Sequence, residues 1–193
     1  MTRWLLPLFL SAALAATAAP SAPSPAPEVS ARTRSGKPFA LSSLKGRVVL
    51  LDFWAPWCVP CRASFPFLDG LEAKYSAQGL SVVGLTLEER EKAVAAFLDA
   101  VPVRFRVVVD ASGRAGEAFR VVAMPTTFLI DREGRIDARF EGGDPKTHAK
   151  IEAAVAALLA GASAAGGDVR VPASLEASGK VKAWRRGYLA EPI

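Results

Sequence analysis

The sequence predicts an α/β fold in which helices flank a central mixed β-sheet. The apolar, β-branched run over residues 48–53 is typical of a strand buried on both faces. A stretch with helical spacing follows it, and a second apolar run over 80–85 completes a strand–helix–strand unit. Two later runs, 127–130 and 135–140, flank the turn Arg132-Glu133-Gly134 and predict an antiparallel pair. This order of elements favours one sheet with helices packed against it.

Hydrophobic spacing and turn residues predict the remaining elements. A helix is expected from Cys58 to about Ala77, because apolar residues recur there at the spacing of one helical face. Those residues are Phe65, Leu68, Leu71 and Tyr75. Pro66 should bend this helix and Gly79 should end it. The other predicted elements are a short hairpin over 29–44, helices over 88–100 and 112–119, a strand over 107–109 and a last helix from Pro145. The fold therefore carries an N-terminal β-hairpin and a helical insertion after the second core strand.

Residues 1–18 are predicted to be an export signal. Arg3 provides a positive start, and the apolar stretch over 5–16 is short for a bilayer span. Small residues at 16–18 suit cleavage, and an uncleaved N-terminal anchor in the inner membrane is the alternative. We therefore expect a periplasmic protein.

Composition divides the rest of the chain into three parts. Residues 19–30 are rich in Pro, Ala and Ser and predict a disordered linker. The domain is expected over 31–160, and 161–193 form a flexible C-terminal extension. In this extension, Trp184 and Tyr188 lie among basic residues, so the segment is a candidate for docking a partner.

Charge and cysteine content narrow the classes of function. The chain has 193 residues and a formal net charge of +5, with its cations scattered along the sequence. The sequence has no dense basic cluster of the kind that would indicate a nucleic-acid partner. Both cysteines of the chain, Cys58 and Cys61, belong to one motif. We expect no structural disulfide, no bound metal and no cofactor.

The spacing of Cys58 and Cys61 indicates redox chemistry. Three residues make just under one helical turn, so both side chains lie on one face at the start of the helix. Unpaired N–H groups and the positive end of the helix dipole lower a thiol pKa there. A zinc site is less favoured because it needs two more ligands, and His148 is the sole histidine. A purely structural bridge is less favoured because so short a loop gains little chain entropy.

The motif and its surroundings resemble the thioredoxin superfamily. The segment Leu51-Asp52-Phe53-Trp54-Ala55, followed by Trp57-Cys58-Val59-Pro60-Cys61, is similar to the active-site segment of that superfamily. Met124-Pro125-Thr126-Thr127 is similar to its cis-proline loop. The finer resemblance is to the TlpA/ResA-like thiol reductases and covers about residues 39–159. It is carried by the stretches 79–84, 88–89, 128–131 and 133–136.

This resemblance implies roles for eight residues. Cys58 attacks a partner disulfide and Cys61 resolves the mixed disulfide. Asp52 matches the buried carboxylate of thioredoxin, and Glu89 matches a glutamate that some TlpA-like proteins place near the cysteines; each is a candidate proton acceptor. The residues expected to bind substrate are Trp57, Pro60, Met124 and Pro125.

The implied partners are disulfide-containing periplasmic proteins, with apocytochrome c and copper-site proteins as candidates. A membrane electron donor would re-reduce the dithiol. The alternative function is a thioredoxin-fold copper-binding protein of the cell envelope, since two thiolates alone can hold Cu(I). Such relatives add a histidine to the cysteines. His148, at the start of an amphipathic helix, is expected at the surface instead.

Overall fold

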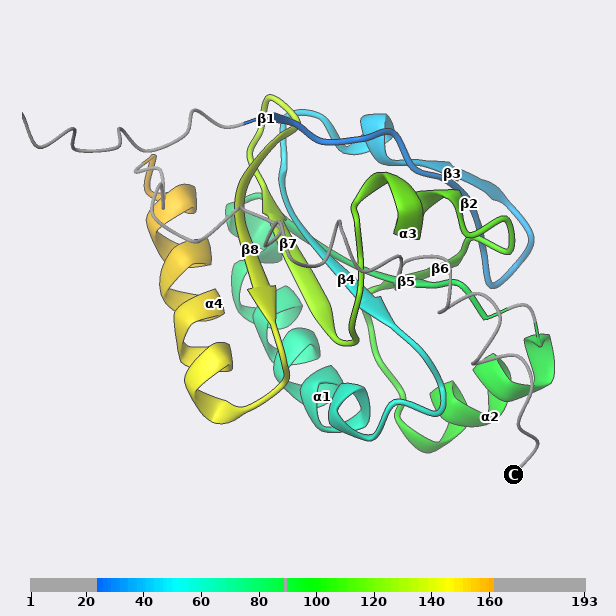
Figure 1. The fold of residues 1–193 in the computed structure, drawn as a ribbon. Helices are drawn as coiled ribbons and strands as arrows, with labels where there is room; N and C mark the ends of the chain where they lie inside the picture. Colours follow the sequence, from blue (N-terminus) through cyan, green and yellow to red (C-terminus); the bar gives the residue numbers. More distant parts are fainter. Residues whose placement is uncertain (1–23, 89, 162–193) are drawn as a thin grey trace, which may run out of the picture.

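Strand β4 (Val48–Trp54) lies in the middle of the sheet, and all seven of its residues are buried. The computed structural model describes residues 24–88 and 90–161. They form an eight-stranded sheet in the order β1-β8-β7-β4-β5-β6-β2-β3, with helices on both faces (Figure 1). The chain therefore has the thioredoxin-like fold that the sequence predicted.

Strand β4 has one parallel and one antiparallel neighbour. Strand β5 (Leu80–Thr86) runs parallel to β4 and is connected to it by helix α1 (Val59–Tyr75) and the short 3₁₀ turn η2 (Ser76–Gln78). On the other side, β7 (Thr126–Ile130) is antiparallel to β4. Strand β8 (Arg135–Glu141) pairs antiparallel with β7, and the register shifts between Leu129 and Ile130. The predicted antiparallel pair is confirmed.

The predicted N-terminal hairpin is also confirmed. It consists of β2 (Ser30–Thr33) and β3 (Pro38–Ala40), followed by the 3₁₀ turn η1 (Leu41–Leu44). The hairpin joins the sheet because β2 pairs antiparallel with β6 (Arg106–Val109). It therefore extends the sheet on the side of β6, away from β7 and β8.

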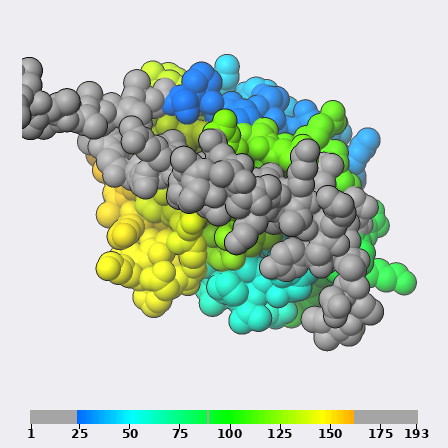
Figure 2. Space-filling model, viewed as in Figure 1, coloured from blue at the N-terminus to red at the C-terminus, as the bar shows by residue number. Residues whose placement is uncertain are grey.

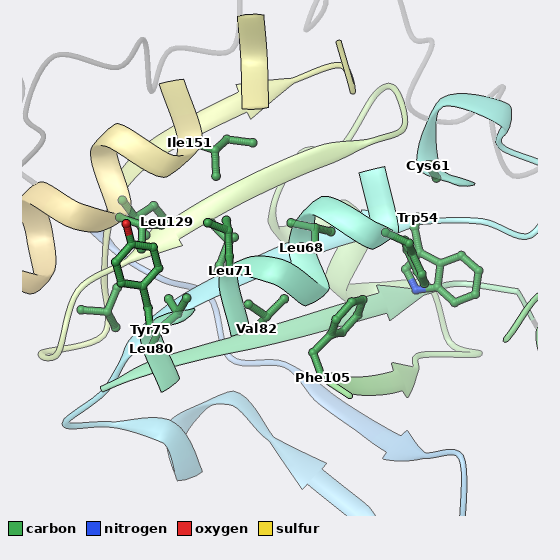
Figure 3. Packing of buried hydrophobic residues seen from close by; sticks show 14 of the residues in the cluster. Trp54, Cys61, Leu68, Leu71, Tyr75, Leu80, Val82, Phe105, Leu129 and Ile151 are labelled. Carbon is green, nitrogen blue, oxygen red and sulfur yellow. The ribbon is translucent and has the colours of Figure 1, made fainter. Parts of the chain in front are cut away.

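The two faces of the sheet bury separate hydrophobic cores. Helices α1, α2 (Glu91–Ala100) and α4 (Pro145–Leu159) contribute to one core, together with Leu50 and Leu129. Figure 3 shows Leu68, Leu71 and Tyr75 of this core close to side chains of the sheet. Helix α3 (Arg114–Ala118) and the hairpin contribute to the other core.

The insertion between β5 and β7 differs in detail from the prediction. Helix α2 begins at Glu91, three residues after the expected start at Glu88. Helix α3 is confined to Arg114–Ala118, because the carboxylate of Asp110 accepts the N–H groups of Ser112 and Ala115 and shapes the turn before it. The strand predicted over 107–109 is confirmed as β6, which runs parallel to β5.

The prediction of a disordered linker is wrong for residues 24–30. Strand β1 (Ser24–Pro25) pairs antiparallel with the start of β8, and the N–H of Ala26 donates to Gly134. Val29 is fully buried in the core beneath the hairpin. Apolar packing and backbone hydrogen bonds therefore order a segment whose composition is typical of a linker.

The cysteine-bearing turn and strand β1 lie at opposite rims of the sheet. Figure 2 shows the first described residues, in blue, along the upper rim and the start of α1, in cyan, at the lower rim. The export signal over 1–18 and most of the extension over 161–193 lie outside the described residues. The proposed boundaries at 18 and 160 remain predictions, whereas the ordered residues 24–30 place the start of the domain before residue 31. Within the part of the chain that is described, no helix is both long and apolar enough to cross a membrane.

The aromatic ring of Phe65 packs helix α1 against the insertion. The ring of Phe65 is fully buried and lies 4.8 Å from that of Trp54, 4.9 Å from Phe97 and 5.2 Å from Phe105, between ring centroids. We expect Phe65→Ala to lower the free energy of unfolding by about 3–5 kcal/mol, through lost burial and the cavity that remains. Urea denaturation measures this change.

The matched control is Val59→Ala on the same helix, where the side chain is 79% exposed. It should change the free energy of unfolding by less than about 0.5 kcal/mol. A similar small effect of Phe65→Ala would mean that the aromatic cluster does not hold the insertion against α1.

Candidate active site

Cys58 and Cys61 form a disulfide at the N-terminus of α1. The sulfur atoms are 2.00 Å apart and the Cα atoms 5.3 Å apart. Strand β4 ends at Trp54, and a turn closed by the Cys58 N–H donating to Ala55 leads into the helix. Cys58 has extended backbone angles and is the N-cap of α1, so the helix begins one residue later than predicted. The two cysteines lie on the first turn, as their spacing indicated.

The helix terminus provides a polar environment for the sulfur of Cys58. The backbone N–H of Cys61 donates to Cys58 Sγ over 3.2 Å. The first turn also carries the positive end of the helix dipole. Both effects favour a thiolate on Cys58 after reduction of the disulfide. Cys58 is slightly exposed and Cys61 is not exposed at all, which agrees with an outer attacking sulfur and an inner resolving one.

Asp52 is buried beneath the helix that carries the cysteines. Side chains alternate along β4, so Asp52 shares a face with Leu50 and Trp54, which pack in the same core as Cys61. Figure 3 shows Trp54 next to Cys61 on this side of the sheet. The Asp52 carboxyl accepts a hydrogen bond of 2.7 Å from the hydroxyl of Thr127, which is the residue opposite Asp52 on β7.

Burial changes the acidity of Asp52. Its other carboxyl oxygen, Oδ2, is buried and has no hydrogen-bond partner among the residues that the structure describes. Desolvation raises the pKa of Asp52 to about 7, although the bond from Thr127 acts in the opposite direction. Asp52 therefore takes up and releases a proton near neutral pH, as a general base requires.

The surface around Cys58 is apolar. Among residues 24–88 and 90–161, Trp57 and Val59 are the large hydrophobic side chains that are exposed. Pro60 is also exposed, and Met124 is half-buried against the core. The Met124–Pro125 peptide bond is cis, as the resemblance implied, and Pro125 is buried. An apolar collar beside a reactive sulfur suits contact with another protein chain.

Glu89, the second predicted proton acceptor, lies outside the described residues, and its role remains a prediction. Its neighbour Glu88 is buried in the turn before α2. The guanidinium of Arg90 donates to both Glu88 oxygens, at 2.8 and 2.9 Å, and the backbone N–H of Arg90 donates as well. These contacts with Arg90 lower the pKa of Glu88. Glu88 is therefore an ionised, paired group rather than part of an exposed helical turn.

His148, expected at the surface, is half-buried. Its ring stacks on Phe67 of α1 at 4.2 Å between centroids, with the planes 10° apart. Its Nε2 atom lies 3.1 Å from Ser64 Oγ. No sequence signal connects these residues, which are 84 positions apart. Sequence reasoning therefore missed Ser64 and assigned His148 no contact.

No three His, Cys, Asp or Glu side chains of residues 24–88 and 90–161 lie together in an arrangement that could hold a metal ion.

A thioredoxin-like sheet with a Cys–Cys pair at a helix N-terminus is the arrangement of the thioredoxin superfamily. The comparison with known proteins agrees with this class. The chain belongs to the Redoxin family, whose model matches residues 21–158. The thiol-disulfide oxidoreductase ResA of Bacillus subtilis is 37% identical over 113 residues, which cover 58% of this chain and 63% of the relative. The predicted resemblance to the ResA-like branch is confirmed, and the match spans less than two thirds of that curated relative.

Solved structures agree with the fold. A Chlorobium tepidum crystal structure, described as a candidate thiol:disulfide interchange protein DsbE, has a TM-score of 0.69 and 37% identity. The similarity covers 73% of this chain and 99% of that one. A secreted Mycobacterium tuberculosis disulfide oxidoreductase, homologous to E. coli DsbE, has a TM-score of 0.58 and 27% identity, covering 67% of this chain and 96% of that one.

The raised pKa of Asp52 should make stability depend on pH. The unfolded chain releases this proton near pH 4, whereas the folded chain keeps it until about pH 7. Stability therefore falls as the pH rises between these values and stays lower above them. Asp52→Asn removes this loss, so the variant should gain about 4 kcal/mol or less relative to the wild type between pH 4 and pH 8.

Urea denaturation of both oxidised proteins at each pH measures this gain. The difference between the two proteins isolates Asp52, because the other titrating groups are common to both. A difference in unfolding free energy that is the same at pH 4 and pH 8 would contradict the raised pKa.

Proposed function

We propose that this protein is a thiol–disulfide oxidoreductase that reduces disulfides of partner proteins in the periplasm. One observation carries the proposal: the Cys58–Cys61 disulfide lies at the helix N-terminus, where the Cys61 N–H donates to the outer sulfur. That arrangement stabilises a thiolate and allows the pair to alternate between dithiol and disulfide.

The reaction begins with the reduced pair. The Cys58 thiolate attacks one sulfur of the partner disulfide, and the other partner sulfur leaves as a thiolate and takes up a proton. Cys61 then loses its proton and attacks Cys58 Sγ. This step forms the Cys58–Cys61 disulfide and releases the second partner sulfur as a thiolate, which takes up a proton. Two electrons pass from the dithiol to the partner, which ends with two thiols.

Asp52 is the group we assign to the second step. It lies on the same side of the sheet as Cys61, and its pKa of about 7 allows it to accept the Cys61 proton as that thiol attacks. Trp57, Val59 and Pro60 surround the outer sulfur and would contact the partner chain. The backbone of Met124 would pair with a partner strand beside Cys58, and Pro125 would contact the same strand through its ring.

The composition of the motif supports reduction rather than oxidation. Val59 and Pro60 separate the cysteines, so no histidine is present there to stabilise the thiolate further. A less stable reduced form is a better electron donor. In an oxidising compartment, a membrane electron donor is then required to restore the dithiol.

Location and partners are inferred from the sequence and from relatives. The apolar segment before residue 18 supports export, with an inner-membrane anchor as the alternative to cleavage. The similar M. tuberculosis protein is described as secreted. Apocytochrome c thiols and oxidised copper-site cysteines are the partner classes that fit a periplasmic reductant.

A glutathione redox titration tests the direction of electron flow. We expect a potential nearer the value of thioredoxin, about −270 mV, than that of a strong oxidant, about −120 mV. The Cys58 and Cys61 alkylation state is the readout. A potential above about −180 mV would reverse the assigned direction.

Trapping with Cys61→Ser tests the mechanism and finds the partner. This variant can form the mixed disulfide but cannot resolve it, so it should retain partner proteins on Cys58 after extraction under non-reducing conditions. The matched control, Cys58→Ser, keeps one cysteine but lacks the attacking sulfur and should retain none. Equal trapping by both variants would contradict the assignment of Cys58 as the nucleophile.

The C-terminal extension adds a second arm to this trap. We propose that residues 180–188 help dock the partner, because Trp184 and Tyr188 lie there among basic residues. Deletion of 168–193 should leave the reduction of a generic disulfide and the melting temperature nearly unchanged, and should reduce partner recovery by Cys61→Ser. Loss of generic reduction would mean that the extension belongs to the catalytic domain.

A further inference from the structure

The connection between β8 and α4 contacts both the Met124–Pro125 loop and the first turns of α1. The N–H of Gly142 donates to the carbonyl of Pro125 over 3.0 Å. At Gly143, an added Cβ would lie 2.3 Å from Ser64 Oγ and 3.0 Å from the carbonyl oxygen of Pro60. This backbone therefore packs directly on the first turns of α1, with no room for a side chain. It delivers His148, in the first turn of α4, to the same place.

A directed chain of hydrogen bonds runs from His148 to the cysteine turn. Ser64 Oγ lies 3.1 Å from the carbonyl oxygen of Pro60, to which it donates. A hydroxyl has a single proton, so the 3.1 Å contact with His148 requires the histidine Nε2–H to be the donor. Burial lowers the pKa of His148, although the charge of Asp144 acts in the opposite direction. The lowered pKa keeps the ring neutral near pH 7. The stack on Phe67 fixes its plane.

The end of this chain belongs to the same peptide group as a donor to the nucleophile. The Pro60 carbonyl and the Cys61 N–H are two ends of one planar peptide unit. That N–H donates to Cys58 Sγ over 3.2 Å. A hydrogen bond to the carbonyl holds the orientation of the peptide plane and polarises it, which strengthens the N–H as a donor. Each hydrogen bond in this chain therefore points toward the reactive sulfur, from His148 through Ser64 to the Pro60–Cys61 peptide.

We propose that His148 and Ser64 are positioning residues, which orient and polarise the Pro60–Cys61 peptide so that its N–H stabilises the Cys58 thiolate. The proposal deepens the proposed function and rests on it for its role in exchange. His148 acts through Ser64, and Ser64 acts through the peptide. Loss of either residue should therefore raise the Cys58 thiol pKa.

The experiment measures the Cys58 pKa directly in the full chain. Thiolate absorbance at 240 nm is titrated in a Cys61→Ser background, which leaves Cys58 as the single thiol and keeps the backbone N–H at position 61. We expect Ser64→Ala to lower the acid dissociation constant of Cys58 about two- to fivefold, because one cooperative hydrogen bond is lost. His148→Ala should act in the same direction and more weakly, and His148→Gln, which keeps an N–H donor, should restore part of the value.

A double variant separates positioning from packing. If His148 acts through Ser64, the pair Ser64→Ala and His148→Ala should match Ser64→Ala alone. Lys150→Ala, on the exposed side of the same helix, is the matched control and should leave the constant unchanged. A further decrease in the double variant would overturn the relay. If folded Ser64→Ala keeps the wild-type acid dissociation constant of Cys58 and only its melting temperature falls, the contact between Ser64 and His148 contributes to packing alone.

This titration needs no partner protein, so it is independent of the proposed function. If the constant shifts as expected but the wild type fails to reduce any disulfide, the proposed function is wrong and the positioning role stands. If the wild type reduces disulfides and the constant does not shift, the positioning role is wrong.

Discussion

The burial of β4 on both faces is the constraint on which the rest of the structure depends. Because all seven residues are inaccessible, helices must cover one side and the hairpin with α3 the other. After β4 the chain turns back and passes over one face of the sheet, and helix α1 is the element that covers this face. The turn between β4 and α1 is therefore forced to the rim of the sheet. The cysteine pair occupies that rim because it follows the strand directly.

The same burial creates the chemistry of Asp52. An aspartate in a fully covered strand exchanges water for apolar neighbours and one hydroxyl, that of Thr127. This is unfavourable for folding, since the charged form is poorly solvated. The surrounding core offsets the cost, and the protein gains a group that changes its protonation near neutral pH. The local departure from good packing and the proposed catalytic role have one physical cause.

Three segments that are far apart in the sequence complete the site. The start of α1 provides the sulfurs, the Met124–Pro125 loop lies beside them, and the β8–α4 connection supports both through Gly142 and His148. Each segment leaves a strand or enters a helix at the same rim of the sheet. Rigid elements thus position a site whose residues are mostly in turns. Such an arrangement keeps the reactive sulfur near the surface while its supporting contacts are buried.

The sequence by itself determined the features that depend on local order and spacing. The strand over 48–53, the helix that follows it and the Cys58–Cys61 spacing required no knowledge of distant residues, since periodicity reports them directly. The resemblance of the 51–61 segment to thioredoxin already implied a buried carboxyl at Asp52. Only the tertiary structure decided that Val29 is core and that Glu88 is paired with Arg90 and buried. It also decided that His148 reaches Ser64, because a contact across 84 positions depends on how two helices pack and leaves no periodic trace in the chain.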